Sequence, residues 1–169
     1  MNNMAIETER KFLIKLPTDE FFSRMGAAVR RMVQTYLTVS GKGERRIRLI
    51  EENGTLSYVY TEKLPIAGTK MSREERERKI SADEYSLLRR EACSELEKVR
   101  YSFPHDGHII EVDVYPHEIG GDALDGMAVM EIELASEDEP FSIPDEITVI
   151  RELTGTREFS NKTLAKKVE

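Results

Sequence analysis

The stretch AIETERKF, residues 5–12, has the alternating pattern of a β-strand with one charged face. Side chains two residues apart in a strand point to the same side, so Glu7, Glu9 and Lys11 share a face opposite Phe12. Two acids and a base on one face have two interpretations. The face is either an ordinary solvent-exposed surface or a functional surface inside the protein.

The length and composition of the chain favour one globular domain over residues 1–169. Asp and Glu outnumber Lys and Arg by 32 to 25, which gives a net charge of -7 at pH 7. This balance argues against nucleic-acid and membrane-surface binding, because both need a basic surface. The single cysteine excludes a disulfide framework. The sequence has no signal-peptide pattern and no apolar membrane span, so a cytoplasmic location is expected.

Strand and turn signals recur along most of the chain. Asn53-Gly54 and Asp106-Gly107 are hairpin-turn dipeptides. The expected strands are residues 4–15, 29–39, 44–51, 55–63, 72–80, 95–103, 108–115 and 127–134. Short helices are expected over residues 18–25, over residues 81–92 and from Ser160 onward, and residues 117–126 are expected to form a loop. This spacing predicts an α+β fold with a mostly antiparallel sheet that closes into a barrel.

The pattern of the opening strand repeats in the others, with one charged face opposite a face that is often apolar. The charged faces carry Glu7, Glu9, Lys11, Arg46, Arg48, Lys63, Arg73, Glu75, Glu77, Lys98, Arg100, Glu111, Asp113, Glu131 and Glu133. The opposite faces carry apolar residues such as Ile47, Leu49, Tyr101, Phe103, Ile110, Val112, Met130 and Ile132. In any single strand this pattern is typical of a sheet with one solvent-exposed and one buried side.

Taken together, the charged faces favour a different arrangement. Acids and bases are nearly balanced in them, and Arg recurs at the i, i+2 spacing. Arg holds phosphate oxygens in a fixed geometry, and paired Glu side chains suit a hard divalent cation. If the sheet curls until its charged faces meet, its interior is a polar tunnel and its apolar faces pack outward against the helices. Such an interior needs counter-ions for both signs of charge, which a metal–polyphosphate complex supplies.

The stretch IETERKF resembles the Glu-x-Glu-x-Lys signature of the CYTH domain, also called the triphosphate tunnel metalloenzyme superfamily. Later stretches resemble the remaining family blocks in the same order: RRIR, YTEK, SREERE, LEKVRYS, IEVDVY, VMEIEL and LTGTREFSNKTLAK. The resemblance covers residues 4–166. It implies an eight-stranded antiparallel β-barrel with a charged interior and short helices packed outside. It also implies action on triphosphates with Mg or Mn.

The resemblance implies roles for individual side chains as well. The expected metal ligands are Glu7, Glu9, Glu131 and Glu133. The expected phosphate-binding residues are Lys11, Arg46, Arg48, Lys63, Arg73, Lys98 and Arg100, with Lys162 reaching the tunnel mouth from the last helix. The expected catalytic set is Glu7, Glu9, Lys11, Glu75, Glu77, Glu111 and Asp113, in which the later acids orient basic residues or the attacking water. The expected reaction is hydrolysis of a terminal phosphoryl group, with water activated by a second metal or an acid.

Residues 72–80 depart from the pattern because both of their faces are charged. Arg73 and Glu75 lie on the face expected to point inward, and Glu74 and Arg76 lie on the other. A shift of one residue in the strand register would exchange the two sets completely. The outer face of this strand is expected to be solvent-exposed.

Three other functions stay open. Some members of the superfamily are adenylate cyclases, which form cyclic AMP and pyrophosphate, and others are thiamine triphosphatases. A polyphosphate-binding module without turnover is the third alternative, against which the complete acidic set argues. Trp is absent and aromatic residues make up 7% of the chain, so no pocket for an organic group is evident and inorganic tripolyphosphate is favoured. The expected partner is this small molecule, and a homodimer is the candidate assembly.

Overall fold

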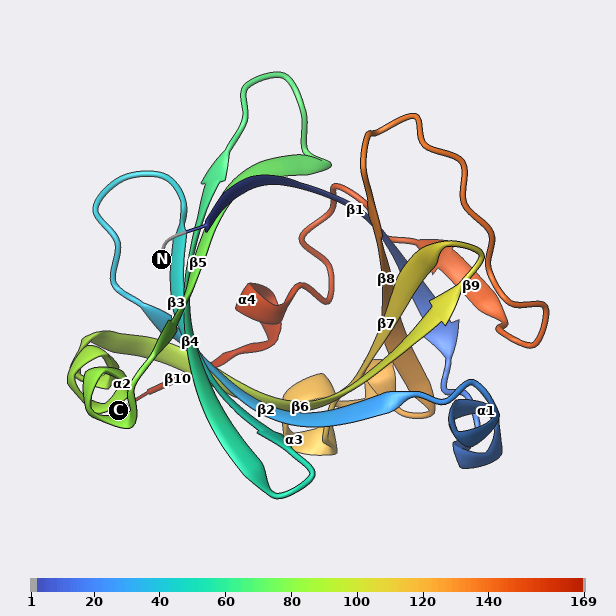
Figure 1. Cartoon of the computed structure of the whole chain (residues 1–169), viewed down its shortest axis with the longest axis horizontal. Coiled ribbons are helices and arrows are strands. Elements are labelled where there is room, and N and C mark those ends of the chain that lie inside the picture. The colour runs from blue at the N-terminus through green and yellow to red at the C-terminus, as the bar shows by residue number, and fades with distance from the viewer. Residues whose placement is uncertain (1–2, 169) are drawn as a thin grey trace.

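The computed structural model describes residues 3–168, so residues 1, 2 and 169 of the expected domain lie outside the described part of the chain. Eight antiparallel strands form a closed ring (Figure 1) in the order β5-β1-β8-β7-β6-β2-β3-β4, and β4 pairs with β5 to complete it. These strands are β1 (Asn3–Lys15), β2 (Ala28–Leu37), β3 (Glu44–Glu52), β4 (Thr55–Pro65), β5 (Ser72–Ile80), β6 (Ala92–His105), β7 (His108–Val114) and β8 (Met127–Leu134). The closed barrel confirms the expected α+β fold.

Two tight hairpins set the register of four strands. Asn53 and Gly54, between β3 and β4, have φ angles of 52° and 79°. Asp106 and Gly107, between β6 and β7, have φ angles of 46° and 78°. Two successive residues with positive φ match the right-handed twist of a hairpin, and Asn-Gly and Asp-Gly adopt this conformation readily. Both turns expected from the sequence are confirmed.

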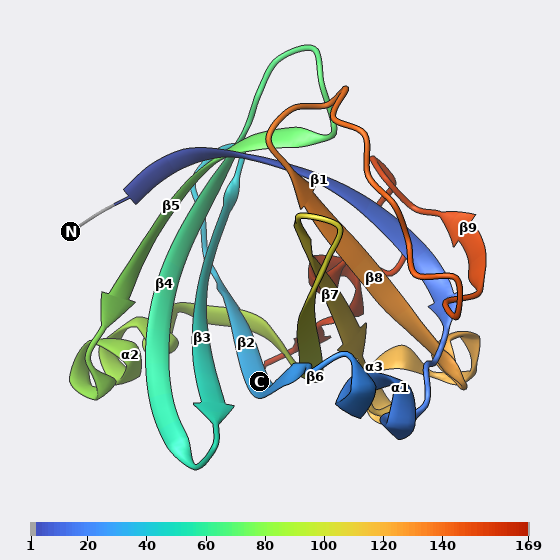
Figure 2. The same cartoon turned by 45° about the vertical axis from the view of Figure 1, so that its right-hand side comes forward.

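The long strand β1 changes partners along its length (Figure 2). Its first half pairs with β5, and its second half pairs with β8. An unexpected strand, β9 (Val149–Glu152), also pairs with β1, and a further strand, β10 (Lys166–Lys167), pairs with β6. All four residues of β9 are exposed, so the strand has no apolar pattern by which the sequence could reveal it.

The helices are short. The first two lie outside the ring of strands, whereas the last lies within the outline of the ring in Figure 1. The helices are α1 (Asp19–Arg24), α2 (Ala82–Leu88), α3 (His117–Gly120) and α4 (Asn161–Leu164), with 3-10 turns at Arg89–Glu91 and Asp122–Leu124. The prediction of a plain loop over residues 117–126 was therefore wrong in part, since α3 and a 3-10 turn lie there. The predicted start of the last helix is confirmed, because the Ser160 side chain accepts a hydrogen bond from the Thr163 amide. Within residues 3–168, no helix has the length and apolar character needed to cross a membrane.

The apolar faces of the strands pack outward, as expected. On one side, Phe22 of α1 stacks on Tyr101 of β6, with ring centroids 3.9 Å apart. On another side, Tyr85 of α2 packs against Tyr58 of β4, with ring centroids 5.0 Å apart. Because these outer faces are buried by helices, the barrel does not need apolar side chains throughout its interior.

One end of the barrel interior is nevertheless apolar. On β1 and β8, Leu13 and Val129 share the inward face with Lys11 and Glu131, one pleat away. They belong to a buried cluster formed by Leu13, Tyr36, Leu96, Tyr115, Leu124, Val129 and Leu153. The inward face thus changes from apolar to charged along the strands. The apolar cluster closes one end of the charged cavity.

Candidate active site

The barrel encloses a cavity of about 1040 Å³. Most side chains on the expected charged faces line it, together with Lys162 of α4. These are Glu7, Glu9, Lys11, Arg46, Arg48, Lys63, Arg73, Glu75, Glu77, Arg100, Glu111, Glu131, Glu133 and Lys162. The tertiary structure therefore brings together side chains from seven strands and one helix. Their individual roles stay predictions.

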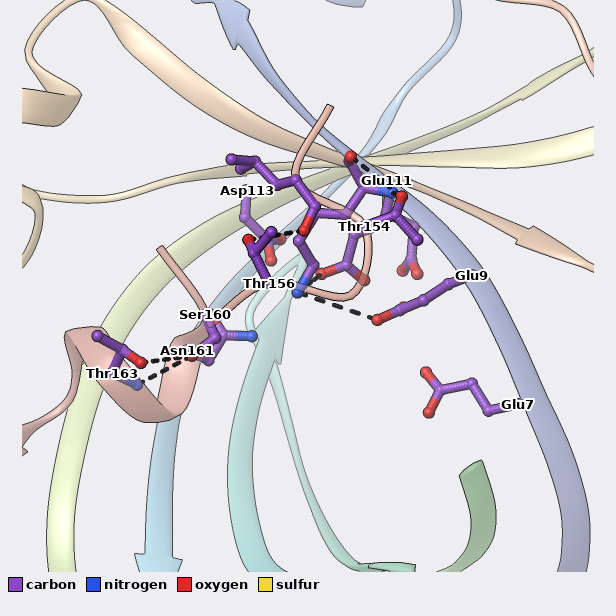
Figure 3. A network of polar contacts seen from close by, with 12 residues as sticks. Glu7, Glu9, Glu111, Asp113, Thr154, Thr156, Ser160, Asn161 and Thr163 are labelled. Carbon is purple, nitrogen blue, oxygen red and sulfur yellow. Dashed lines mark hydrogen bonds and ion pairs between the residues drawn. The ribbon is translucent and has the colours of Figure 1, made fainter. Parts of the chain in front are cut away.

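The acidic wall of the cavity lies on β1 and β8. Glu7 and Glu9 point from β1 toward the C-terminal segment of the chain (Figure 3), and Glu131 and Glu133 pair across from Lys11 and Glu9. The Lys11 ammonium lies 3.6 Å from Glu131 Oε1 and 4.0 Å from Glu9 Oε1. One lysine thus stands between two of the predicted metal ligands.

Crowding of these acids changes their protonation. Burial raises the pKa of Glu9 to about 8, and the nearby carboxylates of Glu131 and Glu7 add to the effect. Burial also opposes ionisation of Glu131, but Lys11 and Arg100 outweigh it and hold the pKa of Glu131 well below its usual range. A pair of adjacent carboxyls with opposite shifts shares a proton when no cation is present.

The basic wall lies on β3 and β4, where positive charges crowd in the same way. Arg46, Arg48 and Lys63 are all buried. Burial lowers the pKa of Arg48 to about 10, and the neighbouring Arg46 contributes. Burial and Arg46 likewise lower the pKa of Lys63, although its ammonium lies 2.7 Å from Glu7 Oε2. Bases held this close together repel one another, and an anion bound between them would relieve that repulsion.

Two predicted site residues, Lys98 and Asp113, lie behind the cavity wall. Asp113 accepts a hydrogen bond of 2.8 Å from Lys98 Nζ, and it accepts two from Arg100, of 2.7 Å from Nε and 2.9 Å from Nη2. Side chains of both Lys98 and Asp113 are 1% exposed. In this arrangement Asp113 fixes the Arg100 guanidinium through a bidentate contact, and Lys98 has no direct access to a ligand in the cavity.

The register of β5 agrees with the inward set expected from the sequence. Arg73, Glu75 and Glu77 line the cavity. Glu77 accepts a hydrogen bond of 3.0 Å from Arg48, and burial, with Glu7 nearby, raises the pKa of Glu75 to about 7. The opposite set lies on the outer face, where Arg78 pairs with Glu84 of α2 at 2.6 Å.

The C-terminal segment, residues 153–163, contributes neutral polar groups to the cavity. After β9, Thr154 accepts a hydrogen bond of 2.9 Å from the Lys11 backbone amide. Asn161 accepts one from the buried Tyr115 hydroxyl, which ties α4 to the end of β7. Thr154, Thr156, Ser160 and Asn161 all line the cavity, and Figure 3 shows the Ser160 side chain turned toward Thr163 of the last helix.

Sequence patterns did not reveal these polar groups, nor the position of Glu44. Glu44 lies two residues before Arg46, so the same period-two rule could have placed it on the inner face. The expected strand over residues 44–51 includes Glu44, but the charged set expected on its inner face begins at Arg46. No comparable signal exists for Thr154, because its place in the cavity depends on the pairing of β9 with β1.

The acidic wall has the chemistry of a divalent-cation site. Within residues 3–168, no three His, Cys, Asp or Glu side chains already converge on a point where they could hold a metal ion. However, burial and the neighbouring Glu131 raise the pKa of Glu9, and Glu7 and Glu133 lie on the same two strands. A divalent cation favours carboxylate oxygens and can replace the shared proton. The residues therefore fit such an ion after a rearrangement of side chains.

The closed antiparallel barrel has crowded carboxylates on one wall and crowded cationic groups on another. This arrangement is typical of proteins that bind a polyanion together with cations. An inorganic triphosphatase from Acetivibrio thermocellus is 30% identical to this chain over 165 residues, which span 96% of this chain and 95% of that protein. The chain belongs to the CYTH, or triphosphate tunnel metalloenzyme, superfamily.

Solved structures agree with the fold. A protein from Pyrococcus horikoshii OT3 matches with a TM-score of 0.56 and 23% identity, covering 78% of this chain and 80% of that one. A conserved hypothetical protein from Pyrococcus furiosus matches with a TM-score of 0.57 and 21% identity, with the same coverage of 78% and 80%. No protein-family model matches the chain.

Proposed function

We propose that this protein is a divalent-metal-dependent triphosphatase that hydrolyses inorganic tripolyphosphate and releases orthophosphate, with Mg or Mn as the metal. The observation that carries the proposal is the division of one cavity into an acidic wall and a basic wall. Glu9 and Glu131 lie on one wall, both within 4.0 Å of Lys11, while Arg46, Arg48 and Lys63 on the other repel one another. A metal-bound triphosphate would reduce both the repulsion among the carboxylates and the repulsion among the cationic groups. The family relationship to an inorganic triphosphatase supports the same substrate.

The basic residues have the first part in the proposed mechanism. Arg46, Arg48, Lys63 and Arg100 hold the phosphate oxygens and offset their charge, and Asp113 keeps Arg100 in place. Positioning and electrostatic stabilisation supply most of the acceleration in phosphoryl transfer. No covalent nucleophile is required.

The acidic residues have the second part. Glu7, Glu9, Glu131 and Glu133 would hold the divalent cation, which, when bound, supplies further charge neutralisation as a Lewis acid. Glu75 is suited to accept a proton from the attacking water, because its pKa of about 7 lies near the working pH. Lys11 stands between Glu9 and Glu131 and is placed to contact both the acids and the phosphate chain.

A second candidate, turnover of an organic triphosphate, has one observation in its favour. Met32, Ile50 and Val59 also line the cavity, and they form an apolar surface that a tripolyphosphate chain does not need. An adenylate cyclase or a thiamine triphosphatase would use such a surface for its organic group. The cavity-lining residues are otherwise dominated by charged side chains, which favours the inorganic substrate.

Product analysis with Mg and with Mn separates these functions. Tripolyphosphate, ATP and thiamine triphosphate are supplied separately, and orthophosphate, pyrophosphate and cyclic AMP are measured. We expect fast release of orthophosphate from tripolyphosphate and little product from the organic substrates. Cyclic AMP and pyrophosphate from ATP would assign a cyclase instead. Tight binding of tripolyphosphate without turnover of any substrate would assign a binding module.

Several further predictions from the sequence accompany this proposal. They are a single domain over residues 1–169, a cytoplasmic location, a homodimer as the candidate assembly, and no nucleic-acid or membrane partner. The net charge of -7 supports the last of these, because a basic surface is needed for either partner.

A further inference from the structure

Glu44 is an acid on the basic side of the cavity. It is the first residue of β3, and its cross-strand partner on β4 is Lys63. Its side chain is 12% exposed. It lies in the wall between the central cavity and an outer hollow of about 540 Å³, since it lines both. An acid at this place opposes the binding of a polyanion, so its presence calls for a physical explanation.

The first contact of Glu44 is with Arg46. Arg46 Nη1 donates a hydrogen bond of 3.4 Å to Glu44 Oε1. No other acidic side chain in residues 3–168 forms an ion pair with Arg46. Burial disfavours the charged guanidinium, but Tyr36 and Glu44 are the leading groups that raise the pKa of Arg46 above its ordinary value. Glu44 is therefore the acid that pairs with the Arg46 guanidinium among the described residues, and it favours one direction of that group.

The second contact is with Arg73, which reaches across the cavity from β5. Arg73 nitrogens lie 3.9 Å from carboxylate oxygens of Glu7, Glu9 and Glu44. No hydrogen bond from the Arg73 side chain accompanies these ion pairs in the described residues, and the side chain is 36% exposed, more than that of any base on the basic wall. Arg73 is thus held less tightly than Arg46, Arg48 and Lys63. Glu44 is its only partner on the basic side of the cavity within residues 3–168.

A cation on the acidic wall would weaken the attraction of Glu7 and Glu9 for Arg73. Glu44 would then be the remaining acid that holds this guanidinium over the cavity. We propose that Glu44 is a positioning residue, which orients Arg46 and Arg73 so that both guanidinium groups meet the phosphate chain at fixed places. The inference rests on the proposed function, because the groups that Glu44 orients act on a triphosphate.

Kinetics of Glu44→Gln test the proposal. Gln keeps the size and an acceptor oxygen but removes the charge, so the fold is expected to persist, which a thermal melt checks. We expect kcat for tripolyphosphate to fall about tenfold, the effect of one charged hydrogen bond worth about 1.4 kcal/mol. KM is expected to stay the same or fall, since a charge that repels the substrate is gone. An unchanged kcat, or a rise in KM that exceeds the loss in kcat, would overturn the proposal.

Glu62→Gln is the matched control. Glu62 lies on β4, lines the outer hollow with Glu44, and accepts a hydrogen bond from the Tyr60 hydroxyl, but it does not line the central cavity. The change removes the same charge from the same region, so it should leave both kcat and KM close to their wild-type values. An equal loss of kcat in Glu62→Gln and Glu44→Gln would mean that only the regional charge matters, which contradicts the proposal.

A binding experiment separates this inference from the proposed reaction. Calorimetry in the presence of Mg, with a methylene-bridged tripolyphosphate analogue that resists hydrolysis, measures the binding affinity in wild type, Glu44→Gln, Arg73→Ala and the double variant. If Glu44 acts through Arg73, the loss of affinity caused by Arg73→Ala is smaller in the Glu44→Gln background. Equal losses in both backgrounds would refute the positioning role. Wild-type protein that binds tripolyphosphate but releases no phosphate would instead refute the proposed function, and the cycle would still decide the role of Glu44.

Discussion

At the scale of single residues, Glu9 has the strongest conflict between burial and charge on the acidic wall. Its pKa is raised to about 8, so the carboxyl is mostly protonated at neutral pH when no metal is bound. Gln resembles this neutral form, and we expect Glu9→Gln to melt within about 3 °C of wild type in chelator. We also expect metal-dependent turnover to fall about 100-fold or more, at least the effect of losing a group that only supports a metal ligand.

Glu74→Gln is a suitable control for this measurement. Glu74 lies on the opposite face of β5 from the inward set and does not line the cavity. Turnover of this variant should match that of the wild type. Full metal-dependent activity in Glu9→Gln would remove Glu9 from the predicted metal ligands.

The raised pKa of Glu9 also predicts that metal binding displaces a proton. Since the pKa of Glu9 is about 8, a cation that needs its carboxylate must release about one proton at pH 7. Titration of the protein with Mn in two buffers of different ionisation enthalpy measures this proton. The apparent affinity should rise as the pH increases from 6 to 8. Heats that are identical in the two buffers would show that Glu9 does not lose a proton to the metal.

At the scale of elements, strand β5 tests whether a charged strand has a functional and a solvent-exposed side. Arg73 lines the cavity and Arg76 does not. We expect Arg73→Gln to raise KM for tripolyphosphate about tenfold, as for the loss of one charged contact, and Arg76→Gln to change it by less than about twofold. Steady-state kinetics of the two variants measure the difference. Similar effects in both would mean that the strand acts through its overall charge.

The C-terminal segment is the element that the sequence described least well. Its helix cap at Ser160 was predictable from local chemistry, but β9 was not, because no residue of that strand is buried. Its position comes from pairing with β1, more than a hundred residues away in the chain. Because of that pairing, the Thr154 hydroxyl accepts a hydrogen bond from the Lys11 amide, and Thr154 lines the cavity.

At the scale of the whole molecule, two groups of acids give stability an optimum in pH. The folded-state pKa values of Glu9 and Glu75, about 8 and about 7, exceed the ordinary value of 4.5. The folded protein therefore holds protons that the unfolded chain has released, and the free energy of unfolding falls as the pH rises from about 5 to 8. Asp113 and Glu131 have lowered pKa values, so the stability that they contribute is lost as the pH falls below about 4.

Thermal melts in chelator between pH 4 and pH 8 measure this dependence. We expect a maximum near pH 5 for wild type, and a smaller decline toward pH 8 in Glu9→Gln, because Gln does not titrate. Groups common to the two proteins cancel in the comparison. Parallel curves for the two proteins from pH 5 to pH 8 would contradict the raised pKa of Glu9.

The sequence by itself determined the eight barrel strands, their hairpin turns and most of the side chains on their inward faces. Alternation with a period of two is a local property of a strand, and Asn-Gly and Asp-Gly favour positive φ without help from the rest of the chain. On β5, where both faces are charged, alternation separated Arg73, Glu75 and Glu77 from Glu74 and Arg76, and the structure shows that the first set points inward. Family resemblance added the expected roles.

The tertiary structure alone decided which of these inward charges share a cavity and which are hidden behind it. Lys98 and Arg100 have the same spacing as Arg46 and Arg48, yet Asp113 draws Lys98 into a buried pair and leaves Arg100 at the surface of the cavity. The tertiary fold also placed Glu44 between the guanidinium groups of Arg46 and Arg73. It brought Thr154 into hydrogen-bonding contact with Lys11. Periodicity specifies the side of a strand on which a residue lies, but the depth of a side chain and its partners depend on contacts between strands distant in sequence.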